Sequence, residues 1–74
     1  MEQEILNVIQ KVVEGAAGKK INDFSEELRL TDLPIDSLDL YTVIEDLEQL
    51  SGKSLSDEDF SSMNAVGDLA RFFS

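Results

Sequence analysis

The stretch from Leu33 to Leu50, LPIDSLDLYTVIEDLEQL, restricts the fold of this chain more than any other. Its apolar residues recur at helical spacing, which places them on one face at 3.6 residues per turn. These residues are Leu40, Val43, Ile44, Leu47 and Leu50. Acids occupy the opposite face, namely Asp39, Glu45, Asp46 and Glu48. The pattern predicts an amphipathic helix over residues 37–50 that packs its apolar face on other elements and turns its acids to water.

The start of this helix has its own signals. Pro34 lacks a backbone N–H and disfavours helical angles at Leu33, so it is expected in a turn just before the helix. Asp36 is a suitable N-cap, because its carboxylate can accept a free backbone N–H of the first turn. Asp39 adds negative charge where the helix dipole is positive. These signals place Ser37 at the first turn of the helix.

The remaining apolar residues predict three further helices and no strand. Residues 2–16 repeat apolar side chains at helical spacing, and the helix is expected to end between Gly15 and Gly18. A long connection follows over residues 19–35, in which Ser25 could cap a single helical turn. Ser56 and Asn64 are expected to cap a short third helix and a fourth helix that buries Val66, Leu69, Ala70 and Phe73. The expected fold class is all-α, a small four-helix bundle with three principal helices, one short one and a long loop between the first two.

The chain has 74 residues, which suit a single domain over residues 1–74 with a small core. It has neither cysteine nor histidine, which excludes disulfides, the usual zinc sites and catalysis that uses an imidazole base or a cysteine nucleophile. The spacing of its acids does not satisfy a calcium-binding EF-hand loop. We therefore expect neither an enzyme nor a metal site.

The formal net charge of -10, from 16 acids and 6 bases, argues against nucleic-acid partners and anionic membrane surfaces. It suits partners with basic patches, because opposite fields speed encounter and orient docking. No apolar run approaches the ~20 residues that cross a bilayer, and the first residues lack the basic start of a secretory signal. We expect a cytoplasmic monomer without membrane insertion.

At this point the chain resembles the acyl carrier proteins, small acidic helical proteins that carry acyl groups on a 4'-phosphopantetheine arm. The resemblance is carried by Asp36, Ser37 and Leu38, which match the family's Asp-Ser-Leu signature, and by Asp39 and the Leu47-Glu48 pair later in the same helix. Core residues at Leu28 to Leu30 and near Val66 extend the similarity over essentially the whole chain.

The resemblance implies that Ser37 is the attachment site of 4'-phosphopantetheine. A phosphopantetheinyl transferase would use coenzyme A and Mg²⁺ to esterify its hydroxyl. Asp36 would cap the helix and help to place metal and donor in the transferase complex, and Leu38 would belong to the same recognition motif. A helix N-terminus is a favourable position for a phosphate.

The resemblance also implies partners and cargo. Asp39, Glu45, Asp46 and Glu48 would meet basic docking patches on acyl-activating and acyl-transferring enzymes of fatty acid, polyketide or related biosynthesis. An alkyl cargo could be sheltered against Val43, Ile44, Leu47, Phe60 and Met63, which are otherwise expected in the core.

The chain departs from the family's usual pattern at several positions: Pro34 in place of glycine, Thr42 in place of an acid, Glu45 and Asp46 in place of neutral residues, and Asn64 and Ala65 in place of a threonine-containing helix start. These changes redistribute the acidic surface and indicate partners outside housekeeping fatty acid synthesis. Two alternatives stay open on the sequence: a carrier of aminoacyl, peptidyl or D-alanyl groups, and an acidic helical adaptor without an arm.

Overall fold

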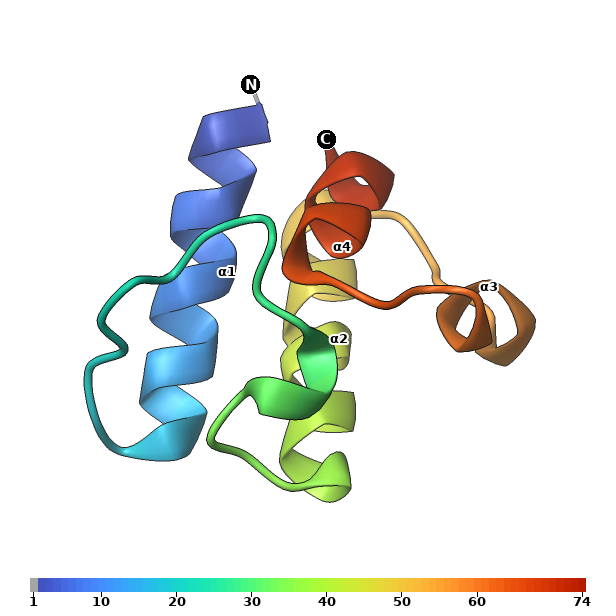
Figure 1. Ribbon diagram of the computed structural model, residues 1–74. Coiled ribbons are helices and arrows are strands. Elements are labelled where there is room, and N and C mark those ends of the chain that lie inside the picture. Colours follow the sequence, from blue (N-terminus) through green and yellow to red (C-terminus); the bar gives the residue numbers. More distant parts are fainter. Residues whose placement is uncertain (1) are drawn as a thin grey trace.

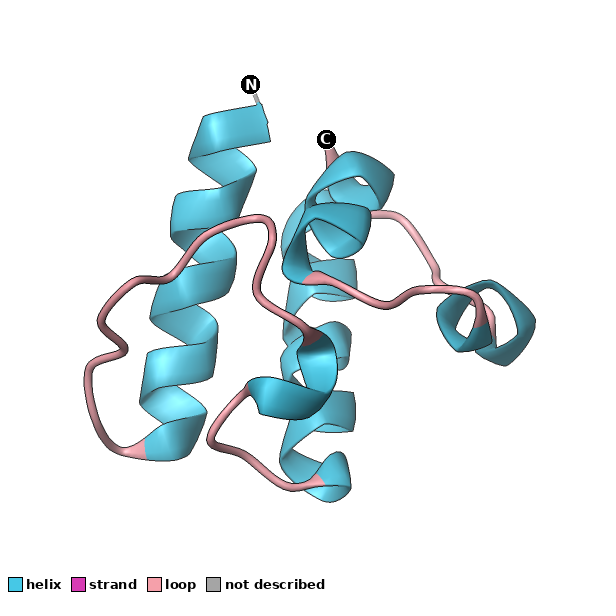
Figure 2. Ribbon diagram, viewed as in Figure 1, coloured by secondary structure: helices cyan, strands magenta, loops and turns pink. Residues whose placement is uncertain are grey.

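A computed structural model describes residues 2–74 of the chain. Over that range it contains helices and loops but no strand (Figure 2). The helices are α1 (Glu2–Ala17), the 3-10 helix η1 (Leu30–Asp32), α2 (Ser37–Ser51), α3 (Asp57–Ser61) and α4 (Val66–Phe73). The expected all-α fold, with three principal helices, a short one and a long first loop, is confirmed.

Three helices enclose the core. The antiparallel helices α1 and α2 lie side by side, and α4 packs against both of them (Figure 1). The short helix α3 projects from the side of α2 that faces away from α1, and the start of α2 lies at the end of the molecule opposite to both termini. Every helix except α3 contributes to the buried residues, which are Ile9, Val13, Leu30, Leu33, Val43, Ile44, Leu47, Val66, Leu69, Ala70 and Phe73.

The prediction that Leu50 belongs to the buried face of α2 is wrong. Its side chain is 69% exposed, whereas Leu47 is almost fully buried. At 100° per residue, Leu50 lies about 80° around the helix from Leu40, at the edge of the apolar stripe. Leu40 itself is partly buried against the core. The buried stripe of α2 is therefore narrower than the pattern of apolar residues predicts.

The long loop is fastened to the start of α4 by backbone hydrogen bonds. The N–H of Leu30 donates to Asn64 O at 2.9 Å, and the N–H of Val66 donates to Leu28 O at 2.8 Å. The N–H of Gly67 donates to the carbonyl of Glu26 at 2.8 Å. A Cβ atom on Gly67 would lie only 2.9 Å from atoms of Glu26. The glycine thus allows the loop to approach α4 closely, although glycine lowers the helix propensity of α4 at this position.

Two expectations about local structure are corrected by these contacts. Residues 25–28 form a turn, closed by a 3.2 Å bond from Leu28 N–H to Ser25 O, and the helical turn lies further on, in η1. Asn64 does not cap α4, whose N-cap is Ala65. The carboxylate of Asp68 instead accepts the N–H groups of Asn64 and Ala65, at 2.8 and 3.0 Å. The first-turn N–H groups that a cap side chain would bind donate to carbonyls instead, those of Leu28, Glu26 and Ala65.

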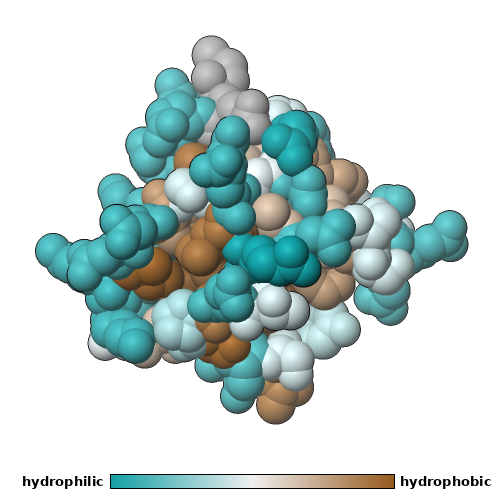
Figure 3. Space-filling view, viewed as in Figure 1, coloured by the Kyte–Doolittle hydropathy of each residue, from teal (hydrophilic) through white to brown (hydrophobic). Residues whose placement is uncertain are grey.

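On the face crossed by the loop from α1 to α2, hydrophobic side chains show between polar ones (Figure 3). Within residues 2–74, no helix is both long enough and apolar enough to cross a membrane.

Candidate functional site

Asp36 determines how α2 begins. Its backbone is extended, with φ -86° and ψ 179°, and its side chain accepts the N–H of Asp39 at 2.8 Å. Its carbonyl accepts the N–H of Leu40 at 2.9 Å. The predicted N-cap is therefore confirmed. Of the four N–H groups that a helix leaves without intrahelical partners at its start, those of Ser37 and Leu38 have no protein acceptor within residues 2–74.

Ser37 follows the cap and is exposed to solvent. Within the described range, residues 2–74, its hydroxyl makes no hydrogen bond to the protein, and only two other serines, Ser25 and Ser54, share this property. The hydroxyls of the other five are engaged with backbone groups, those of Ser51, Ser56, Ser61, Ser62 and Ser74. Ser37 thus combines a free hydroxyl with a place at the N-terminus of a long helix, which the other serines do not.

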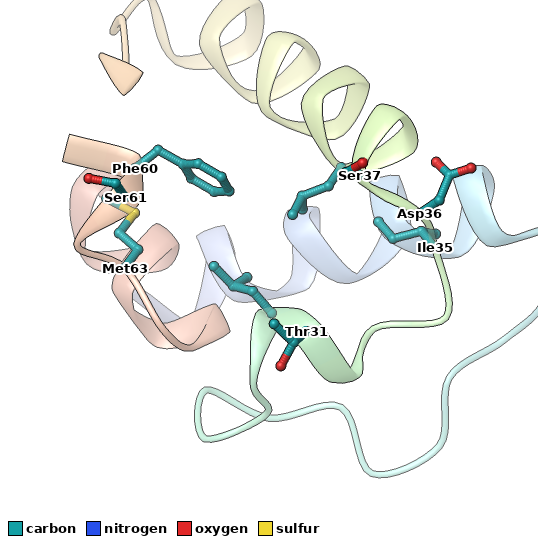
Figure 4. Close-up of a pocket in the computed structure, with 9 residues that line it drawn as sticks. Thr31, Ile35, Asp36, Ser37, Phe60, Ser61 and Met63 are labelled. Carbon is teal, nitrogen blue, oxygen red and sulfur yellow. The ribbon is translucent and has the colours of Figure 1, made fainter. Parts of the chain in front are cut away.

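A pocket of about 400 Å³ opens beside Ser37. Figure 4 shows its walls: Thr31 from η1, Asp36 and Ser37 from the start of α2, and Ser61 and Met63 from α3 and the turn that follows. The ring of Phe60 points from α3 into the space between these elements. The pocket therefore lies between the long loop, α2 and α3, within reach of the Ser37 hydroxyl.

The residues predicted to line a cargo site are distributed over two regions. Phe60 and Met63 line the pocket beside Ser37. Val43, Ile44 and Leu47 lie in the core and are absent from the lining of that pocket. Five lining residues were missed by the sequence analysis: Leu30, Thr31, Ile35, Leu40 and Ser61. Helical spacing could identify Leu40, but the loop residues are brought to the pocket by long-range pairing that no local pattern reveals.

The four acids of α2 are not equivalent. Glu45 and Asp46 are exposed, whereas Asp39 and Glu48 are partly buried. The carboxylate of Glu48 accepts the N–H of Leu55 at 2.6 Å and so ties α2 to the chain that leads into α3. Leu38 is 76% exposed on the first turn of the same helix. Glu45 and Asp46 are the acids most available to another molecule, with the apolar side chain of Leu38 about two turns away.

Two carboxylates elsewhere in the fold have a lowered pKa. Hydrogen bonds from the backbone N–H groups of Asn64 and Ala65, with a further contribution from Arg71, lower the pKa of Asp68. The N–H of Ile21 and then the side chain of Gln10 lower the pKa of Glu14. Both carboxylates hold loop backbone to a helix. Among residues 2–74, no group of three or more carboxylates is placed to hold a metal ion.

Comparison with known families identifies one match. The model of the phosphopantetheine attachment site matches residues 7–73, which is nearly the whole chain and includes α2 with its cap and Ser37.

Curated proteins of similar sequence agree with this match. An acyl carrier protein of Kineococcus radiotolerans is 31% identical over 74 residues, covering 99% of this chain and 91% of the relative. Nodulation protein F of Rhizobium leguminosarum bv. viciae is 34% identical, covering 89% of this chain and 79% of the relative. An acyl carrier protein of Thermotoga maritima is 30% identical, covering 95% of this chain and 88% of the relative.

Proposed function

Since the chain belongs to the acyl carrier protein family, whose members bear a phosphopantetheine arm and carry acyl groups without catalysing reactions, we propose that the arm is attached to Ser37. The observation that carries this proposal is the exposed Ser37 hydroxyl, which makes no hydrogen bond to the described protein, at the N-terminus of α2 and beside a pocket of about 400 Å³.

The surroundings of Ser37 fit a phosphodiester. The N–H groups of Ser37 and Leu38 are left without protein acceptors in residues 2–74, and the positive end of the α2 dipole favours an anion at this position. Coenzyme A would donate the arm in a reaction catalysed by a phosphopantetheinyl transferase with Mg²⁺. The serine oxygen would lose its proton and bond to the phosphorus that bears pantetheine, the pyrophosphate bond of coenzyme A would break, and adenosine 3',5'-bisphosphate would leave. Asp36 would keep the helix start in place while its second carboxylate oxygen faces the transferase.

The pocket beside Ser37 is proposed as the place where the near end of the cargo is sheltered. Its volume of about 400 Å³ falls in the ~300–1,000 Å³ range of small-ligand pockets. Phe60, Met63 and Leu40 supply apolar walls, and Ser37, the proposed attachment site, lines the same pocket. A short acyl chain fits this arrangement better than a charged aminoacyl group, which would have to lose its hydration against an apolar wall.

The exposed acids Glu45 and Asp46 are proposed as the docking surface for successive enzymes of fatty acid, polyketide or related biosynthesis. Opposite charge on the enzymes would speed encounter without tight binding. Once docked, the tether would make delivery of the cargo an intramolecular event at high effective concentration.

The proposal is tested by intact-mass measurement after incubation with coenzyme A, Mg²⁺ and a broad-specificity phosphopantetheinyl transferase. The wild-type protein is expected to gain the mass of one phosphopantetheine group, and Ser37→Ala is expected to gain nothing. Ser61→Ala is the matched control, because it removes a hydroxyl from the same pocket and is expected to be modified like the wild type. Modification of Ser37→Ala would show that the arm is attached elsewhere.

A further inference from the structure

A second hollow lies between α2 and α3, on the other side of Phe60 from the pocket beside Ser37. We call it the α2–α3 groove and define it by its lining residues, Tyr41, Ile44, Glu45, Glu48, Leu55, Asp57 and Phe60. Its volume is about 210 Å³. Ile44 is buried and Leu55 and Phe60 are partly buried, whereas Tyr41, Glu45 and Asp57 are exposed. The groove thus has an apolar floor and a rim that carries two carboxylates from different helices.

The two rim carboxylates lack a cation of their own. Glu45 and Asp57 make no side-chain hydrogen bond and no ion pair within residues 2–74, whereas Glu48 is already bonded to the N–H of Leu55. Lys53 is the only Lys or Arg between residues 30 and 70. Its ammonium donates to the carbonyls of Phe72 and Ser74, at 3.3 and 2.6 Å, at the end of α4. No basic side chain of the described protein therefore neutralises the groove.

Aromatic rings form the third part of the groove. The rings of Tyr41 and Phe60 have centroids 6.0 Å apart and are tilted by 52°. Tyr41 is 51% exposed on the second turn of α2. A cation placed over an aromatic face is attracted by the ring quadrupole, and a planar guanidinium can stack on the ring as well. The ring of Tyr41 is therefore available to a cationic group that also reaches Glu45.

We propose that the α2–α3 groove receives one arginine side chain of a partner protein. Glu45 and Asp57 would bind its guanidinium from two sides, Tyr41 would stack on it, and Ile44 and Leu55 would contact its methylene groups. The volume of about 210 Å³ is below the ~300 Å³ of small-ligand pockets and suits one side chain rather than a peptide segment. Lysine fits less well, because its compact ammonium is strongly hydrated and offers no plane for stacking.

This inference deepens the proposed function, since it rests on α2 being the surface that meets partner enzymes. It also assigns a role to Glu45, one of the acids at positions where a neutral residue was expected from the resemblance. Glu45 and Asp57 act together although they are twelve residues apart in the chain. Partner enzymes that lack a suitably placed arginine would lose this contact, and the groove would therefore contribute to the choice of partner.

The test is a titration of the apo and the phosphopantetheine-bearing protein, followed by backbone amide NMR. The probe is Nα-acetyl-arginine amide, with the lysine analogue and the citrulline analogue, which has nearly the shape of arginine without its charge, as comparisons. The arginine probe is expected to shift the amide signals of residues 41, 45, 57 and 60 at lower concentration than the lysine probe, and the citrulline probe is expected to leave them unchanged.

Matched variants separate the groove from the general negative charge. Glu45→Gln is expected to weaken binding of the arginine probe about 2- to 5-fold, the range set by an exposed ion pair. Asp46→Asn removes the same charge from the neighbouring position, which does not line the groove, and is expected to have a smaller effect. Tyr41→Leu is expected to reduce the preference for arginine over lysine. Dispersed amide spectra show that each variant is folded.

The proposal would be overturned if Glu45→Gln and Asp46→Asn weakened binding of the arginine probe equally. It would also be overturned if the citrulline probe bound as well as the arginine probe. Because both the apo and the phosphopantetheine-bearing protein are titrated, failure of the groove proposal can be distinguished from failure of the proposed function. Binding by apo protein that cannot be modified at Ser37 would support the groove and contradict the attachment site. Modification at Ser37 without selective arginine binding would support the attachment site and contradict the proposed role of the groove.

Discussion

The carboxylate of Asp36 accepts the backbone N–H of Asp39 at 2.8 Å, and this single bond defines the first turn of α2. Ser37 lies between the two residues, so its hydroxyl is held at the helix start by a contact in which it takes no part. The proposed attachment of the arm to Ser37 therefore depends on a stable helix N-terminus as well as on the serine itself.

Removal of this cap tests that dependence. Asp36→Ala is expected to lower the free energy of unfolding by about 1 kcal/mol, because the N–H of Asp39 loses its acceptor. Asp36→Asn keeps an acceptor oxygen and is expected to cost much less. Urea denaturation of the two variants measures the difference. Equal destabilisation by alanine and asparagine would show that charge, and not the hydrogen bond, is what matters at this position.

The close contact between Gly67 and Glu26 leads to a second prediction. Gly67→Ala is expected to destabilise the protein by about 1–3 kcal/mol, because the new methyl group meets Glu26 at 2.9 Å and overpacks the loop. Gly15→Ala is the control, since that position in α1 has no atom within 4 Å of a Cβ. It is expected to stabilise the protein by about 0.5–1 kcal/mol. A gain in stability for both variants would contradict the contact.

The corrected face of α2 is tested by two substitutions three residues apart. Leu47→Ala is expected to cost about 2–5 kcal/mol, as is usual for truncation of a buried leucine. Leu50→Ala is expected to change stability by about 0.5 kcal/mol or less, because its side chain is largely exposed. A similarly large loss of stability for both variants, measured by thermal or urea unfolding, would show that the side chain of Leu50 is part of the core.

A pH dependence follows from the lowered pKa of Asp68. Its native pKa is below the ordinary value of 3.8, so the ionised carboxylate stabilises the fold above that pH, and the stabilisation is lost as the pH falls through the native pKa. Asp68→Asn cannot ionise. The stability advantage of the wild type over this variant is therefore expected to be full at neutral pH and to shrink in acid. A difference that is constant with pH would contradict this role of Asp68.

Features that depend on neighbouring residues could be predicted from the sequence. The caps Asp36 and Ser56 were predictable because each is a short acceptor side chain that binds an N–H three residues later in the chain. The end of α1 near Gly18 was predictable because a glycine adopts positive φ there, at 73°. Helical spacing similarly identified the buried residues Val43, Ile44 and Leu47.

Features that depend on distant residues could not be predicted. The turn at η1 and the loop walls of the pocket, Thr31 and Ile35, are positioned by pairing of residues 26–30 with residues 64–67. Asn64 was a reasonable cap by composition, but the N–H groups at the start of α4 that a cap side chain would bind donate to the carbonyls of Leu28, Glu26 and Ala65. Spacing alone also cannot show how far around α2 the neighbouring helices extend, which is why Leu50 was misplaced.

The most direct test of the central claim is to locate the arm on the modified protein. Cleavage after Arg29 and Lys53 releases residues 30–53, a peptide that contains both Ser37 and Ser51. Fragmentation of that peptide in a mass spectrometer distinguishes the two hydroxyls. Every fragment that carries the phosphopantetheine mass is expected to include Ser37. An arm located on Ser51, or on any peptide outside residues 30–53, would contradict it.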